Sequence, residues 1–140
     1  MKFYKNNAYP EIFLHDCQFK MEYTNNDLNL LFDNGFCRQN IGMTKAKSRI
    51  QVSDISLDEV RIRIFKYKTI LVKFKVIGRD LEFSELDVFF KNYSLEIVDE
   101  YYCYGEFLYK CTPYPYSSNQ PFDLLELVVT HEERPIEYYL

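Results

Sequence analysis

The amino-acid sequence predicts a mostly β fold, either an antiparallel sandwich or a strongly curved, barrel-like sheet, with one short helix near 84–92. The chain contains 13 Tyr and 12 Phe but no Trp, and aromatic side chains fit the pleated, half-buried surface of a sheet. Apolar and polar residues alternate with a period of two in many segments, and turn signals separate these segments. The 140 residues show no linker and no internal repeat, so we expect a single domain spanning 1–140.

The alternating segments predict a series of short strands. In the first segment Cys17, Phe19 and Met21 alternate with polar residues. The stretches 25–27 and 34–35 are turn signals, so the first two segments should form a hairpin. The expected strands are 14–24, 28–33, 49–55, 60–64, 70–76, 94–104, 106–112, 122–131 and, at a sheet edge, 136–140.

The clearest hairpin lies between residues 60 and 80. Ile62 and Ile64 alternate with arginines, whereas Val72 and Phe74 alternate with lysines. With a turn at 67–69, Ile62 would pair with Phe74 and Ile64 with Val72. The apolar residues expected in the core are Phe19, Leu30, Ile62, Ile64, Val72, Phe74, Leu125 and Leu127.

The expected helix at 84–92 rests on two local signals. The stretch from Ser84 to Asp87 resembles a capping box, with Asp in place of the usual Glu or Gln. Leu86, Phe89 and Phe90 then follow the i, i+3, i+4 spacing of one helix face.

Charge is distributed unevenly along the chain. Residues 38–80 hold 11 basic and 4 acidic side chains, a net of +7, whereas residues 96–140 hold 2 basic and 9 acidic ones, a net of −7. In the expected register the basic residues Arg61, Arg63, Lys73 and Lys75 share one face of the hairpin, with Arg61 opposite Lys75 and Arg63 opposite Lys73. Like charges directly opposite destabilise a sheet, so this basic face needs an anionic neighbour.

We expect this anionic neighbour to be internal, from the acidic segment 96–132, with an external partner as the competing hypothesis. The acidic stretch of the same chain can supply carboxylates, such as Glu96, Glu100 or Glu126. The alternative is that the basic face binds phosphate or an acidic protein. A pI of about 5.2 and the absence of a known nucleic-acid-binding motif make nucleic acid the less favoured partner.

The sequence gives little support to an enzyme, so we expect a protein without catalytic activity. His15 and Cys17 would share a strand face, and an imidazole can lower the pKa of a thiol, but no glycine-rich turn nearby offers an oxyanion hole. Neither nucleotide-binding glycine motif occurs, and no pair of carboxylates is singled out by its spacing. We therefore expect no catalytic residues and no cofactor.

The four cysteines predict free thiols rather than a disulfide or a metal site. The N-terminus lacks the apolar segment of a signal peptide, and no apolar run reaches the ~20 residues that a membrane helix needs. We therefore expect a cytoplasmic protein without membrane contact, in which thiols stay reduced. The spacing of the cysteines and of His15 and His131 fits no common zinc motif.

Tyrosines gather around a proline-rich stretch at 111–121. Tyrosine is enriched at protein interfaces because it supplies a large contact area at low entropic cost. The alternative is that these rings cover one end of the sheet. The candidate binding residues are Tyr102, Tyr104, Tyr109, Tyr114 and Tyr116.

Three stretches of the sequence carry a resemblance. Leu14-His15-Asp16-Cys17, the hairpin end 30–35 and the stretch 96–102 resemble small bacterial β-rich proteins of the Firmicutes type, some of which are similar to immunity proteins that bind and block toxins. The resemblance implies a protein-binding role without catalysis. A small-molecule-binding β-barrel is the alternative, although the Gly-x-Trp signature of lipocalins is missing.

Overall fold

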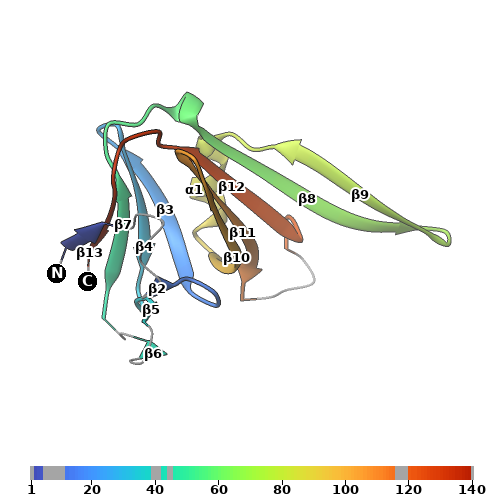
Figure 1. The fold of residues 1–140 in the computed structure, drawn as a ribbon. Helices are drawn as coiled ribbons and strands as arrows, with labels where there is room; N and C mark the ends of the chain where they lie inside the picture. The colour runs from blue at the N-terminus through green and yellow to red at the C-terminus, as the bar shows by residue number, and fades with distance from the viewer. Residues whose placement is uncertain (1, 5–11, 39–41, 44–45, 116–119, 140) are drawn as a thin grey trace.

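The computed structural model describes residues 2–4, 12–38, 42–43, 46–115 and 120–139 (Figure 1). Its main feature is an open, antiparallel, ten-stranded sheet. Within the described residues the strands at its two ends are not paired with each other, so the sheet does not close into a barrel. The predicted fold class, a mostly β chain with a strongly curved sheet and one short helix, is confirmed.

The ten-stranded sheet consists of two halves that join at β3 and β10. In spatial order the first half comprises β1 (Lys2–Tyr4), β13 (Ile136–Tyr139), β7 (Ser48–Val52), β4 (Asp27–Phe32) and β3 (Gln18–Thr24). The second half comprises β10 (Ser94–Cys103), β11 (Glu106–Tyr114), β12 (Leu124–Thr130), β8 (Val60–Ile70) and β9 (Lys73–Asp80). A separate three-stranded sheet is formed by β2 (Ile12–Phe13), β5 (Cys37–Arg38) and β6 (Gly42–Met43).

The core lies on the concave face, toward which every second residue of the central strands points. Strands β4, β7, β11 and β12 alternate strictly between buried and partly exposed positions over most of their length. The largest fully buried side chains include Phe19 from the first half and Phe107 and Tyr109 from the second. Because such alternation follows directly from the two-residue period of a strand, these strands could be located from the sequence.

The helical segments close one end of the core. A 3-10 turn, η2 (Phe83–Glu85), leads into α1 (Leu86–Phe89), within the range predicted for the helix. Phe83 packs edge-on against Tyr23 of β3, and Phe89 contacts Phe122 just before β12. A second 3-10 turn, η1 (Leu57–Glu59), precedes β8. None of the helices in the described part of the chain has the length and apolar character needed to span a membrane.

Two predicted strand positions need correction. The first long strand begins at Gln18 rather than at residue 14, because Asp16 adopts a left-handed conformation with φ 65° and the chain turns there. The Asp16 backbone N–H donates a hydrogen bond of 2.8 Å to the Ile97 carbonyl oxygen. The strand predicted at the sheet edge, 136–140, instead lies between β1 and β7 as β13.

The register predicted for the central hairpin was wrong. The turn consists of Leu71 and Val72, and Ile64 pairs with Arg79 rather than with Val72. Ile62 and Ile64 are buried as predicted, but Val72 is 96% exposed and Phe74 68% exposed. The other predicted core residues, Phe19, Leu30, Leu125 and Leu127, are buried.

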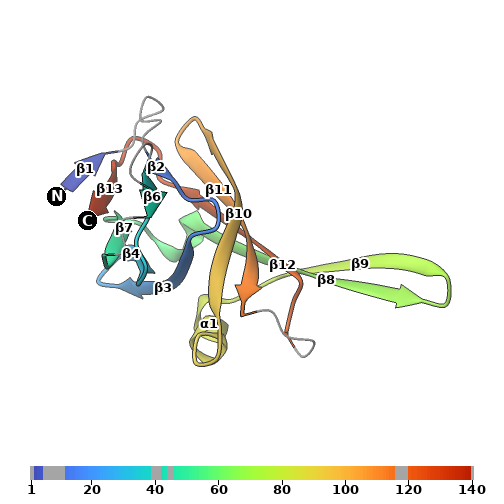
Figure 2. The same ribbon diagram turned by 90° about the horizontal axis from the view of Figure 1, so that it is seen from below.

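The physical reason for this error is the length of the hairpin. The pairing of β8 with β12 ends at Phe65, which lies opposite Leu124. From residue 66 onward β8 is paired only with β9, and the hairpin extends away from the rest of the molecule in both views (Figures 1 and 2). Apolar side chains beyond that point therefore have no second layer to cover them.

Candidate functional site

The part of the hairpin that extends beyond the body, residues 66–77, is here called the arm. All eight residues of β9 are exposed on both faces, although the strand contains three large apolar side chains. Soluble proteins seldom leave such side chains clustered on the surface without a function. The arm is therefore the strongest candidate site in the described part of the chain.

One face of the arm is apolar. Residues paired across a sheet share a face, so the pairing of Tyr67 with Val76 and of Thr69 with Phe74 places these four side chains together. The Tyr67 and Phe74 rings are in contact, with centroids 5.6 Å apart. Phe74 is mostly exposed, and Tyr67 and Val76 are a little under half exposed, so this face offers an aromatic and aliphatic surface for contact.

The opposite face of the arm is basic. Lys68 and Lys75 lie directly opposite each other, and Lys73 is on the same face nearer the tip. No carboxylate of the described residues lies within ion-pair distance of these three ammonium groups, whereas Lys66, at the base of the arm, is 3.9 Å from an Asp123 oxygen. The outer part of this face thus carries uncompensated positive charge.

The tip of the arm combines exposure with backbone strain. Leu71 is 92% exposed and has a φ of 59°. Residues other than Gly, Asn and Asp rarely adopt this left-handed backbone conformation. Val72 follows with 96% exposure. A turn with no role beyond reversing the chain would favour Gly or Asn at such a position, so the apolar residues at the tip point to contact with another molecule.

The predicted basic face is divided by the observed register. Arg61 and Arg63 share a sheet face with Phe74 and Val76, whereas Lys73 and Lys75 lie on the other face. The four residues are therefore not gathered on one surface. The prediction was wrong because it depended on the turn at 67–69, and moving the turn reassigned the faces.

Near the body, basic side chains are matched by carboxylates of the same chain. Successive residues in register across five strands alternate in charge, in the order Asp99, Lys110, Glu126, Arg63 and Asp80. The Arg63 guanidinium also forms an ion pair of 3.0 Å with Asp80. Glu126 lies in register beside Arg63, but the ion pair of Arg63 is with Asp80. Among the described residues, no carboxylate of 96–132 forms an ion pair with Arg61, Arg63, Lys73 or Lys75, so the prediction that the acidic stretch supplies their partner was wrong.

The five candidate tyrosines do not form one surface. Tyr109 is fully buried in the core and Tyr102 is partly buried beside it. Tyr104 is 99% exposed at the turn between β10 and β11, whereas Tyr114 is 44% exposed at the far end of β11. Tyr116 lies outside the described residues. The clustering in sequence was misleading because β11 separates its two ends in space.

Two of these tyrosines belong to a polar cluster inside the sheet. The Tyr102 hydroxyl donates to Glu100 Oε1 (2.9 Å) and lies 3.1 Å from the Tyr109 hydroxyl, while Glu100 Oε2 accepts a 2.6 Å hydrogen bond from the Leu14 N–H. Burial is the main cause that raises the pKa of Tyr102, Tyr109 and Tyr138. The hydroxyls therefore stay protonated, and the cluster ties the chain near Leu14 to β10.

A bulge in β10 creates this cluster. The register shifts between Ile97 and Asp99, and a bulge turns the following side chains to the other face of the strand. Glu100 and Tyr102 consequently point inward, in line with Tyr109 and Phe107. No glycine or proline marks the bulge in the sequence, so the inward direction of Glu100 could not be predicted.

The residues considered for cysteine or metal chemistry are not assembled into a site. His15 is exposed and pairs with Asp16 (2.9 Å), whereas the Cys17 thiol is buried, which raises its pKa to about 11. All four cysteines are free, and Cys111 is also buried. Among the described residues no group of histidine, cysteine and carboxylate side chains is placed to hold a metal ion.

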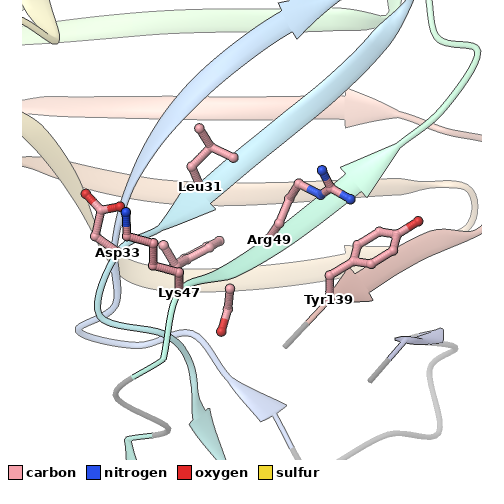
Figure 3. A pocket seen from close by; sticks show the side chains of 7 residues that line it. Leu31, Asp33, Lys47, Arg49 and Tyr139 are labelled. Carbon is pink, nitrogen blue, oxygen red and sulfur yellow. The ribbon is translucent and has the colours of Figure 1, made fainter.

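A shallow pocket of about 350 Å³ lies at the ends of β4 and β7, beside Tyr139 of β13 (Figure 3). Its wall includes Arg49, whose guanidinium lies over the Tyr139 ring, 4.3 Å from the centroid. Leu31, Arg49 and Tyr139 are in register on the outer face of the sheet. This pocket is therefore not the interior cavity that a ligand-binding barrel requires, and the open sheet offers no closed barrel.

Comparisons with protein-family models, with curated proteins and with solved structures gave no match to this chain.

Proposed function

We propose that this protein is a non-enzymatic protein-binding module and that the arm is its binding surface. The observation that carries the proposal is the exposure of Leu71, Val72 and Phe74 on a hairpin that projects beyond the core (Figure 2). Burying such side chains against a partner gives about 1.5–3 kcal/mol each. The remainder of the sheet is built as a stable platform that positions the arm.

The partner proposed here is a protein with an acidic surface. Among the described residues, no carboxylate lies within ion-pair distance of Lys68, Lys73 and Lys75, and Lys68 and Lys75 lie opposite each other. An acidic partner would therefore remove an existing repulsion as well as add attraction. The aromatic pair Tyr67 and Phe74 shares its face with Val76, and such a mixed aromatic and aliphatic surface is typical of contacts with a protein. A toxin bound by an immunity protein, as the resemblance in sequence implies, is one member of this class.

The first experiment locates the binding surface by crosslinking. A photoreactive residue is placed at Phe74 in the arm and, as a control, at Tyr104, which is similarly exposed at the β10–β11 turn. In cells that naturally produce the protein, we expect a specific adduct from position 74 and none from position 104. The captured protein is then identified, purified and titrated with the wild-type chain.

A shortened arm provides the decisive control. Residues 69–74 are replaced by Asn-Gly, which forms a tight two-residue turn and can close on Lys68 and Lys75, a pair already opposite each other. The Tyr67 N–H keeps its 2.7 Å bond to Asp123, so the base of the hairpin is retained. Loss of binding with an unchanged melting temperature supports the proposal, whereas wild-type affinity of the shortened variant would contradict it.

A further inference from the structure

The outer edge of β9 is an unpaired strand edge along the length of the arm. Ile70 and Lys73 close the turn, and in a two-residue hairpin the closing residues bond to each other. The odd-numbered residues of β9 therefore direct their backbone groups toward β8. The Leu81 N–H, which bonds to the Ile62 carbonyl at 2.8 Å, continues the same pattern.

The even-numbered residues of β9 direct their backbone groups outward. Phe74, Val76 and Gly78 thus present N–H and C=O groups to the open edge, and in the described part of the chain no strand pairs with that edge. Exposed edges are templates for strand addition by another chain. Natural proteins often shorten, bulge or cover such edges, but β9 extends for eight residues without a register break.

We propose that β9 binds its partner by strand addition, taking an extended acidic segment as an eleventh strand. This inference rests on the proposed function and names the chemistry of the partner segment. Residues opposite each other share a face, so acidic side chains of the added strand would face Lys73 and Lys75, and apolar ones would face Phe74 and Val76. The segment recognised is therefore one in which carboxylates alternate with apolar residues.

A second copy of the same chain does not fit this pattern. In antiparallel self-pairing of β9, the two registers with the greatest overlap set Arg79 opposite either Lys73 or Lys75, and a register shifted further sets Lys75 opposite Lys75. Like charges in directly opposite positions destabilise the pairing. The lysines thus discourage self-association while favouring an acidic strand.

The test uses a synthetic peptide of alternating glutamate and valine, about as long as β9, with binding followed by fluorescence anisotropy. The controls are a lysine–valine peptide and a peptide with the same glutamates and valines in two blocks. Hydrogen exchange at the Phe74, Val76 and Gly78 amides, measured by NMR, reports directly on strand addition. The alternating acidic peptide should slow this exchange and bind more tightly than either control.

Two substitutions at one position separate backbone pairing from side-chain contact. Val76→Ala and Val76→Pro both remove the valine side chain, but only proline removes the outward N–H, and an edge strand tolerates proline there. Unchanged exchange at Lys75 and Ile77 shows that the hairpin is intact. Strand addition predicts that Val76→Pro binds the peptide about tenfold more weakly than Val76→Ala, since a lost hydrogen bond leaves a partner group unsatisfied.

The outcomes distinguish this inference from the proposed function. Equal affinities of the two Val76 variants, or absence of peptide binding, would overturn strand addition. The proposed function would still stand if the purified partner lost affinity for the shortened arm. Tighter binding of a duplex oligonucleotide than of the acidic peptide, at equal ionic strength, would overturn the assignment of an acidic protein segment to this edge.

Discussion

Lys68 and Lys75 lie directly opposite each other on the β8–β9 hairpin, with no carboxylate of the described residues within ion-pair distance of either. Their repulsion lowers the stability of the free arm, because like charges in cross-strand pairs are unfavourable. The same two ammonium groups favour an anionic partner. The relationship thus links the local stability of the arm to its proposed binding role.

Replacing one of the two lysines should stabilise the arm. In Lys68→Glu a carboxylate faces Lys75, and we expect the arm to gain about 0.5–1 kcal/mol in local opening free energy. Hydrogen exchange of the Lys75 and Ile77 amides measures this gain. Lys20→Glu, at an exposed position on β3, is the charge control, and equal protection in both variants would contradict the observed register.

Truncation of one phenylalanine in the arm and one in the core tests whether the arm lies outside the core. Phe74→Ala should change the free energy of unfolding by no more than about 0.5 kcal/mol, because the side chain is already exposed. Phe107→Ala should cost about 3–5 kcal/mol, because Phe107 is 1% exposed and its removal leaves a cavity. Urea denaturation of both variants provides the measurement, and a large loss from Phe74→Ala would mean that the arm is packed.

The core strands could be predicted from the sequence because apolar residues recur at every second position in each of them, and those residues face the core. Leu125 and Leu127 of β12 follow this rule, and both are fully buried. The arm follows the same alternation in sequence, yet Phe74 is exposed. The two-residue spacing of apolar side chains predicts that one face of a strand is apolar. It does not predict whether a second layer of the protein covers that face.

Two further features of the structure depend on backbone details that composition does not reveal. The bulge between Ile97 and Asp99 turns Glu100 inward, and the left-handed Leu71 lies in a turn at 71–72 rather than at the predicted 67–69. Neither position carries a glycine or proline that would mark it. The basic face was consequently misassigned, and the carboxylates expected from the acidic stretch form no ion pair with Lys73 or Lys75 among the described residues.

The strained residue at the tip of the arm should lower the stability of the hairpin while contributing to binding of the partner. Leu71→Gly removes a left-handed leucine, which costs about 1–2 kcal/mol, while glycine loses about 0.5–1 kcal/mol more entropy on folding. We expect a net gain of about 0.5–1 kcal/mol in the stability of the hairpin, seen in slower hydrogen exchange. Binding of the partner should weaken, because the exposed leucine side chain is lost. Unchanged affinity would show that the tip makes no contact.

Thiol reactivity should follow burial. Cys103 is exposed, whereas Cys17 and Cys111 are buried, and burial raises the pKa of the Cys17 thiol to about 11. Since the thiolate is the reactive form, a maleimide at neutral pH should label Cys103 first. Cys17 and Cys111 should react only in denaturant. Mass spectrometry of partly labelled protein checks the order, and early labelling of Cys17 would contradict its burial.

The most direct test of the central claim compares two charge-matched variants in a titration with the purified partner. The arm variant carries Lys68→Glu and Lys75→Glu, and the body variant carries Lys20→Glu and Lys91→Glu at exposed positions outside the arm. Both variants change the net charge equally. We predict that the arm variant loses affinity by about a hundredfold at low salt, with a smaller loss at high salt, while the body variant stays within about threefold of the wild type. Equal losses in the two variants would show that net charge, and not the arm, determines binding.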